Sequence, residues 1–366
     1  PQTVFRDGYE TSLTGRMLLL SPAVWNGVST AGTARDMARR QLTVTVNTTI
    51  HETVAAFIDL LRLATLTELQ ERHLEQAREN EALARRLFEV GRYSEADVLR
   101  WNVEVAQRNS ELYEQRRGVR MAALALENLM NVEPRGTTRP APGLPPRLRD
   151  EIDRFRNMSD ESWERFLARS LEDVVAGNPQ LLVLEATERL AELDHRGSLT
   201  NFLPSVVVSG SYGWQNNDTV ELDGEKAWSV TAALSMPVFT SLDNFSERQR
   251  TKARLRETRA GVADGRRQLL LSAEAARSAI LSSTAQLDLA EAGLASARRS
   301  YEIQDNRYRL GRLSNLEWVD ANLALQDAEQ RRTSAYYDLV LAIADYYQSR
   351  GEMTSLLRSG SGEEGR

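Results

Sequence analysis

The residues best suited to a specific role in this sequence lie in two short turns. Val90-Gly91-Arg92-Tyr93-Ser94 is followed by Asp97, and Leu310-Gly311-Arg312-Leu313-Ser314 is followed by Glu317 and Asp320. A serine with an acid three residues later is typical of a helix N-terminus, because the hydroxyl accepts from an early backbone amide and the carboxylate favours the positive helix end. A glycine commonly ends the preceding helix. Each turn therefore predicts a tight helical hairpin, and capping alone suffices to explain both serines and the acids that follow them.

Other residue types offer no constellation for catalysis or metal binding. The three histidines, His51, His73 and His195, are far apart, and none has a second histidine at metal-ligand spacing. The phosphate-cradling pattern G-x-x-x-x-G-K-[ST] is not present. The 52 acidic residues are interleaved with 46 basic ones, so we expect most carboxylate pairs on solvated helix surfaces. These observations predict no enzyme, no metal site and no cofactor.

Composition limits the remaining classes of function. A net charge of -6 and a pI near 5.5 argue against a nucleic-acid binder, which needs a concentrated basic surface. The chain contains no cysteine, which excludes disulfides and thiolate chemistry from this stretch. No apolar run approaches the roughly 18 residues of a spanning helix, so a membrane role would require strands.

The sequence is internally duplicated. A shift of 220 residues superimposes the two glycine turns and continues downstream, where Asn102 meets Asn322. A second match, at a shift of 214, lays Leu20-Ser21 over Leu234-Ser235 and Val24-Trp25 over Val238-Phe239. Five prolines fall between Asn131 and Asp150, so this stretch is not expected to be regular helix or central strand. Two copies of one unit, separated by this segment, are the simplest interpretation.

Long helices flank both turns. Apolar residues recur at alternating spacings of three and four, which predicts coiled-coil packing of antiparallel helices. A helix from about Thr251 to Tyr308 would be about 87 Å long at 1.5 Å per residue, too long for a compact domain. The seam after the second glycine comprises Trp318, Ala321, Leu325, Ala328, Arg332, Ala335, Leu339, Ala342 and Tyr346.

Two segments alternate as strands do. From Pro204, apolar Val206, Val208, Tyr212 and Trp214 alternate with small or polar residues, and the segment from Trp228 to Ser235 alternates in the same way. A tilted strand of roughly 9 to 11 residues with this alternation is typical of a transmembrane barrel. Two strands cannot close a barrel, and open edges are not tolerated in lipid, so further strands must come from elsewhere in the chain and from other chains.

The pattern resembles the TolC-like outer-membrane efflux protein family. The resemblance lies in Asn178-Pro179 opening a helix, the Phe202-Leu203-Pro204 strand entry, Leu234 to Phe239, and the paired glycine turns. It implies a mainly α fold with β: long antiparallel coiled-coil hairpins form a tunnel, and a transmembrane β-barrel is completed by trimerisation. It also implies a passive exit duct for a tripartite efflux pump or type I secretion system, in the bacterial outer membrane with a large periplasmic extension.

The resemblance also implies boundaries and partners. The first repeat would span 1–132, with a strand at about 11–25 and a tip at 91–97, followed by a linker and equatorial segment at 133–177. The second would span 178–350, with a helix at 178–199, strands at about 204–215 and 227–238, and a tip at 311–317, before a tail at 351–366. Because the first copy should begin with a signal peptide, a helix and another strand, we expect the sequence to be N-terminally incomplete. The implied partners are two further copies in a homotrimer, a periplasmic adaptor, an inner-membrane pump of RND, ABC or MFS type and outer-membrane lipid, with no nucleic acid.

Site residues follow from the same resemblance. An arginine expected near Leu313 is absent, which predicts a looser or differently latched closed state. The implied periplasmic gate is Glu317 and Asp320, the closed-state latch is Tyr308 and Asp97, the adaptor-docking tips are Gly91, Arg92, Ser94, Gly311, Arg312 and Ser314, and the membrane-interface aromatics are Tyr212, Trp214 and Trp228.

Each role has an alternative. Asp320 could lie on an ordinary solvated helix face, and Tyr308 falls on the heptad stripe, where an aromatic residue more often packs. Trp214 and Trp228 could be buried in a soluble sheet, although we favour interface anchoring. A soluble coiled-coil scaffold would explain the helices but not the strands, and a periplasmic adaptor would need more strand than this chain contains.

Overall fold

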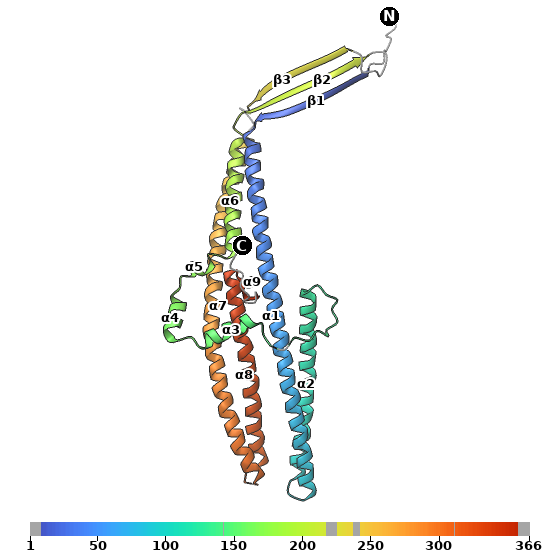
Figure 1. Cartoon of the computed structure of the whole chain (residues 1–366), viewed down its shortest axis with the longest axis vertical. Helices are drawn as coiled ribbons and strands as arrows, with labels where there is room; N and C mark the ends of the chain where they lie inside the picture. The colour runs from blue at the N-terminus through green and yellow to red at the C-terminus, as the bar shows by residue number, and fades with distance from the viewer. Residues whose placement is uncertain (1–8, 142, 217–224, 237–241, 311, 358–366) are drawn as a thin grey trace. The chain divides into compact units, whose positions relative to one another are not determined.

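The computed structural model describes residues 9–141, 143–216, 225–236, 242–310 and 312–357, which divide into two compact units (Figure 1). The first unit contains residues up to 41 and 182–266, and the second contains 42–181 and 267 onward. The first holds a sheet and the helical segments next to it. The second holds two long helical hairpins and several short helices. None of the helices in the described ranges contains an apolar stretch that meets the length and hydropathy needed to cross a bilayer.

The sheet of the first unit has three antiparallel strands in the order β1-β2-β3. They are β1 (Tyr9–Leu20), β2 (Ser205–Asn216) and β3 (Glu225–Ser235). The register places Leu13 opposite Tyr212 and Tyr212 opposite Trp228, so apolar residues of all three strands share one face. The other face carries small hydroxyl residues, and Ser211 and Ser229 are hydrogen-bonded across it at 2.9 Å.

The predicted first strand, 11–25, was wrong at its C-terminal end. The strand ends at Leu20, and helix α1 (Pro22–Glu89) begins two residues later, so Val24 and Trp25 are helical. Proline has no N–H for a sheet ladder but is well tolerated in the first turn of a helix, which explains the switch. The 227–238 strand similarly ends early, at Ser235, while residues 237 and 238, with the predicted match at Val238-Phe239, lie outside the described part.

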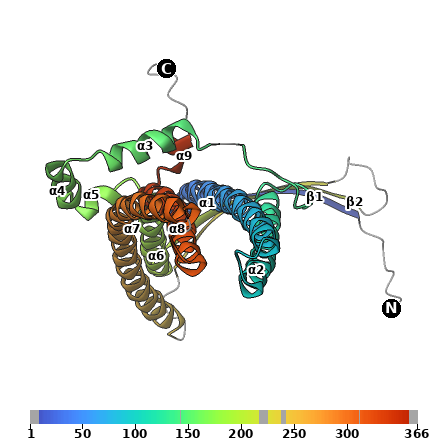
Figure 2. The same cartoon turned by 90° about the horizontal axis from the view of Figure 1, so that it is seen from below.

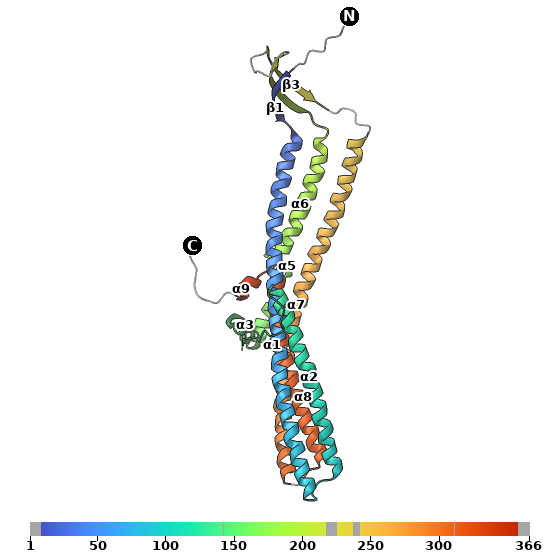
Figure 3. The ribbon, with the colours of Figure 1, turned by 90° about the vertical axis from the view of Figure 1, so that its right-hand side faces the viewer.

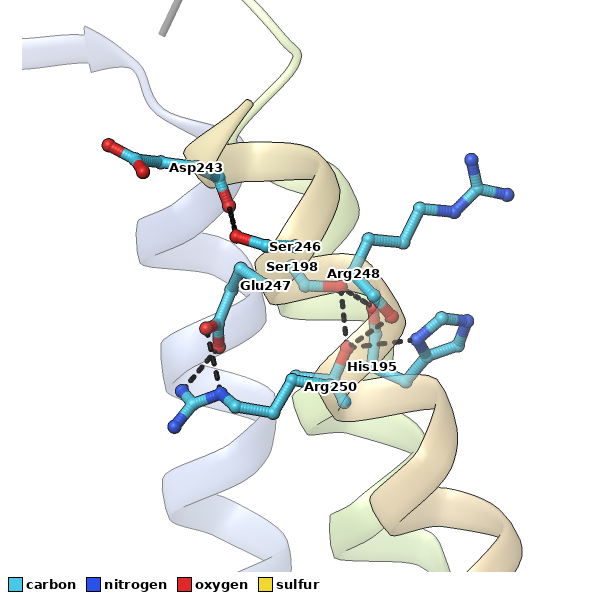
Figure 4. A network of polar contacts seen from close by, with 8 residues as sticks. His195, Ser198, Asp243, Ser246, Glu247, Arg248 and Arg250 are labelled. Atoms are coloured by element: carbon cyan, nitrogen blue, oxygen red, sulfur yellow. Dashed lines mark hydrogen bonds and ion pairs between the residues drawn. The ribbon is translucent and has the colours of Figure 1, made fainter. Parts of the chain in front are cut away.

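Three helices accompany the sheet in the first unit: the start of α1, α6 (Pro179–Thr200) and the start of α7 (Asp243–Arg309). Hydrogen bonds join them near the strand ends. Asn26 Nδ2 donates to the Leu193 carbonyl at 3.1 Å, which links α1 to α6. Buried Thr251 donates to Ser198 Oγ at 3.0 Å and lies 3.2 Å from His195 Nδ1, which links α7 to α6 (Figure 4).

The long helices exceed the predicted length. Helix α7 begins at Asp243 rather than near residue 251, and both α1 and α7 are about 100 Å long at 1.5 Å per residue. The earlier start of α7 includes Glu247 and Arg250, whose ion pair one turn apart stabilises the first turns of this helix. Apolar periodicity did not reveal these turns because they carry mainly polar residues.

The second unit contains two antiparallel hairpins, α1 with α2 (Glu95–Leu129) and α7 with α8 (Asn315–Arg350) (Figures 2 and 3). Leu60 of α1 packs against Ala123 and Leu126 of α2. Ile280 and Leu287 of α7 share a larger core with Leu339 and Ile343 of α8, all four fully buried. The alanines of the predicted seam allow this close approach of the helices.

Short helices cover the middle of this unit. They are α3 (Pro146–Arg156), α4 (Asp160–Ala168), α5 (Leu171–Val175) and, after the left-handed cap at Gly351, α9 (Met353–Leu357). The expectation that residues up to 150 would not be helical was wrong, because Pro146 occupies the first turn of α3, where proline fits. Leu148, Ile152 and Phe155 then recur at helical spacing and are buried in the same core as α8.

The chain after α2 is folded around one carboxylate. Glu127 is 2% exposed and accepts hydrogen bonds from the backbone amides of residues 135 to 138 and from the Thr138 hydroxyl, at 2.6 to 3.2 Å. Gly136 adopts a left-handed φ of 64°, which lets successive amides point at the carboxylate. These hydrogen bonds lower the pKa of Glu127 to about 2, with the Thr138 hydroxyl contributing most.

Candidate functional site at the hairpin tips

Both hairpin tips close with the same backbone hydrogen bond. In the first tip, Gly91 has a φ of 71° and the Arg92 amide donates to the Leu87 carbonyl at 2.8 Å. In the second, the Arg312 amide donates to the Arg307 carbonyl at 2.9 Å, the equivalent pair at a shift of 220 residues. A bond from a residue to the carbonyl five positions earlier is typical of a helix that ends at a left-handed residue. Gly311 lies outside the described residues.

A capping box then opens the second helix of each hairpin, as the sequence predicted. The Asp97 amide donates to Ser94 Oγ at 3.3 Å, and the Ser94 amide donates to the Asp97 carboxylate at 3.1 Å. Ser314 and Glu317 repeat both bonds at the same distances. Hydrogen bonds from the serines lower the pKa of both carboxyl groups.

An aromatic cluster joins the two hairpins just behind the tips. Trp318 of α8 is 3% exposed and Trp101 of α2 is 2% exposed, and their ring centroids lie 5.6 Å apart. Tyr308 of α7 stacks on Trp318 at 5.0 Å, and Tyr301 lies 5.9 Å from it. The Trp318 indole N–H donates to Asp305 Oδ1 at 3.1 Å, so its polar atom is satisfied inside the cluster. Helices from both halves of the chain therefore share one apolar contact at this end.

A polar bridge lies beside the cluster. Asn315 Nδ2 donates to Asp97 Oδ1 at 3.1 Å, and the Tyr308 hydroxyl donates to Asn315 Oδ1 at 3.4 Å. The Tyr308 hydroxyl also accepts a hydrogen bond from the Tyr93 hydroxyl. Burial raises the pKa of Tyr308 and keeps it a neutral donor. The structure thus brings the predicted pair of Tyr308 and Asp97 together through Asn315, which links the second hairpin to the first.

The two acids predicted for a gate have different surroundings. The Glu317 carboxylate is engaged by the amide and hydroxyl of Ser314. Asp320 lies one turn further along α8, exposed, at the edge of a groove of about 500 Å³ between the starts of α2 and α8. Exposed Leu99 and Leu316 line the same groove. Both carboxylates are exposed, but only Glu317 takes part in a capping box.

The remaining predicted residues lie on the surface. Arg92, Ser94, Arg312 and Ser314 are all exposed at the tips. In the sheet, Tyr212, Trp214 and Trp228 share the apolar face; the Tyr212 and Trp214 rings lie 4.8 Å apart, and Trp228 is 74% exposed.

Sequence reasoning missed Tyr93 and Asn315 as part of this site. Neither stands at a position where the two copies agree, since Tyr93 meets Leu313 and Asn315 meets Glu95. The available signal was a different one: the aromatic residues of the cluster all lie within about three helical turns of one of the two glycines.

Three comparisons with known proteins agree on the family. Residues 171–352, about half of the chain, match the family model described as outer membrane efflux protein. The outer membrane efflux protein BepC of Brucella suis is 21% identical over 339 residues, which cover 90% of this chain and 69% of that protein.

Solved structures share the fold. VceC of Vibrio cholerae superimposes with a TM-score of 0.78 at 15% identity, covering 94% of this chain and 87% of that one. The MtrE outer membrane channel of Neisseria gonorrhoeae, in its open state, gives a TM-score of 0.77 at 16% identity, covering 95% and 80%. The chain belongs to the outer membrane efflux protein family.

Proposed function

We propose that this protein is the outer-membrane channel of an efflux pump, a passive exit duct that is a homotrimer. The observation that carries the proposal is the three-stranded sheet, which exposes one apolar face and has two open edges. Leu13, Trp228, Val230 and Leu234 are each more than 65% exposed on that face. Open edges are disfavoured in water and in lipid, and bare apolar faces are disfavoured in water. Both are satisfied when neighbouring strands close the sheet and lipid covers its outside.

The aromatic residues of the apolar face support a lipid contact. Tyr212, Trp214 and Trp228 lie toward one end of the sheet, at the C-terminal end of β2 and the N-terminal end of β3. Aromatic residues concentrate at the membrane–water interface because their rings combine apolar and polar parts. In a soluble sheet, a core would have to cover Trp228.

Docking of a periplasmic adaptor at the tips is the second part of the proposal. The groove between α2 and α8 presents Leu99 and Leu316 beside Arg100 and Asp320, a surface suited to the amphipathic end of another helical hairpin. Docking there would compete with the contact between the two hairpins, because the same helix starts carry Asp97 and Asn315. The adaptor would thereby open the tips, and an inner-membrane pump would supply the energy.

Electron microscopy and bilayer recordings of the full-length protein test the duct. Threefold particles with a short barrel and a long helical tunnel, together with a conductance that persists at constant voltage, are the expected result. Monomers without conductance would overturn the proposal in favour of a soluble scaffold.

Docking is testable by cross-linking, because the chain has no native cysteine. Arg92→Cys and Arg312→Cys should each cross-link to a single-cysteine hairpin tip of the cognate adaptor. Arg165→Cys on α4, also exposed, serves as the matched control. Equal cross-linking at all three positions would refute docking at the tips.

A further inference from the structure

Arg16 is a charged residue in the middle of β1, on the polar face of the sheet. It is the eighth of twelve residues of the strand and stands opposite Ser209 of β2, which in turn stands opposite Thr231 of β3. Its neighbours on that face are therefore short hydroxyl side chains, which leave the long arginine side chain exposed. Among the described residues, no hydrogen bond or ion pair engages its guanidinium.

The charges on the two faces of the sheet are placed differently. On the apolar face, Lys226 lies at the second position of β3, beside the aromatic residues, where a long side chain can reach the aqueous interface. Arg16 lies at mid-strand, where a charge on the lipid side would be costly. If the sheet spans a bilayer, the Arg16 side chain must therefore face the water-filled interior.

Negative charge on the polar face lies far from Arg16. Glu10 is the other charged side chain that the structure describes on this face, six residues earlier in β1. At about 3.3 Å per residue the two positions are about 20 Å apart, beyond the Debye length of about 8 Å at physiological salt. Within the described part of the chain, no negative charge therefore neutralises Arg16.

We infer that Arg16 forms a ring of three positive charges inside the barrel of the trimer and makes this section of the duct favour anionic solutes. The inference rests on the proposed trimeric channel, because one subunit contributes one charge and only closure places three around a common axis. Its ligand class is small inorganic and organic anions. The ring would act in series with the acidic tips, whose charge has the opposite sign.

The expected size of the effect follows from Coulomb's law. Three unit charges roughly 10 Å from an ion on the axis, in water and screened by 0.1 M salt, enrich anions by about two-fold. The enrichment should increase at 0.01 M salt, where the Debye length is about 30 Å, and disappear at 1 M, where it is about 3 Å.

Reversal potentials in planar bilayers under a potassium chloride gradient test the ring. Arg16→Gln should lower the ratio of chloride to potassium permeability about four-fold at 0.1 M salt, because the two-fold enrichment of anions is accompanied by a two-fold depletion of cations. Arg16→Glu should lower the ratio further. Lys226→Gln removes one positive charge from the other face of the same sheet and should leave the ratio unchanged. All variants are also recorded in the Asp320→Asn background. This background reduces the negative charge at the tips, so that ion selectivity at the entrance does not hide a change of selectivity in the barrel.

The outcomes separate the inference from the function on which it rests. A wild-type protein that forms no channels refutes the duct itself. Channels whose permeability ratio is unchanged by Arg16→Gln and Arg16→Glu in both backgrounds refute the ring, as does an equal shift in Lys226→Gln.

Discussion

Asn315, at the start of α8, donates a hydrogen bond of 3.1 Å to the carboxylate of Asp97, in the first turn of α2. The two residues are 218 positions apart in the sequence and belong to different hairpins. Asn315 also accepts from Tyr308 of its own hairpin. One amide therefore connects the two halves of the duplicated chain at the end where we propose that the duct opens.

Removing this amide should favour the open tip. Asn315→Ala removes the bond to Asp97 and the acceptor for Tyr308, and a hydrogen bond contributes about 1 kcal/mol, or about a five-fold change in an equilibrium. We expect channel open probability in planar bilayers to rise by about that factor. Asn306→Ala changes an exposed asparagine of α7 and should have no effect. If both variants behave alike, the bridge does not restrain the tip.

The aromatic cluster should contribute most of the stability at this end. Trp318→Ala leaves a cavity among Trp101, Tyr301 and Tyr308 and should lower the free energy of unfolding by about 3 to 5 kcal/mol. Trp318→Phe keeps much of the packing but removes the indole donor to Asp305, which retains its ion pair with Arg309, so a smaller loss is expected. Leu316→Ala, at a half-exposed neighbour, should change the value by less than about 0.5 kcal/mol. Chemical unfolding in detergent measures all three.

The two acids of the second tip should respond differently to neutralisation. Asp320→Asn removes an exposed charge that is not part of the capping box, so it should reduce cation selectivity without altering helix α8. Glu317→Gln removes charge but keeps an oxygen that can accept from Ser314, whereas Glu317→Ala also removes the cap and should destabilise the start of α8. Reversal potentials report the loss of charge as a change in ion selectivity. Hydrogen exchange at the tip reports the loss of the cap. Selectivity that is unchanged in all three variants would exclude an acidic gate here.

The loop around Glu127 should loosen in acid. The pKa of its carboxyl is lowered to about 2 from the ordinary value of 4.5, so its contribution to stability is fully present above pH 4.5 and is lost as the pH falls toward 2. Amide exchange at residues 135 to 138 should therefore accelerate over that range. Glu127→Gln should show fast exchange already at pH 7. Glu133→Gln alters an exposed ion pair with Arg135 in the same loop and should retain protection.

A buried histidine should make the helical body sensitive to mild acid. His73 of α1 is 3% exposed, its Nε2 lies 3.0 Å from Glu329 of α8, and burial lowers its pKa from 6.5. Below pH 6.5 the unfolded chain binds a proton that the folded chain does not, so stability falls by up to about 1.4 kcal/mol per pH unit until the folded-state pKa is reached.

The His73→Gln variant should remove this decline. Thermal unfolding midpoints between pH 7 and 5 are the measurement. His51→Gln, which alters the pair with Asp345, is the matched control and should leave the decline in place. A wild-type midpoint that stays constant over this range would contradict the prediction.

The features that could be predicted from the sequence arise from residues close together in the chain. The capping boxes at Ser94 and Ser314 need only a serine and an acid three residues later, so their hydrogen bonds could be predicted from spacing. The alternation in β2 and β3 fixed which residues share a face, because successive strand residues point to opposite sides. The end of β1 could have been read from Pro22 in the same way.

The tertiary structure decided which of these local features meet. The bridge from Asn315 to Asp97 and the stacking of Tyr308 on Trp318 beside Trp101 depend on how two hairpins with long, alanine-rich seams align, and such seams permit several registers. The Glu127 loop likewise depends on a left-handed Gly136 that no pattern marks. Contacts between residues more than 200 positions apart depend on the packing of whole helices, so only the folded chain fixes them.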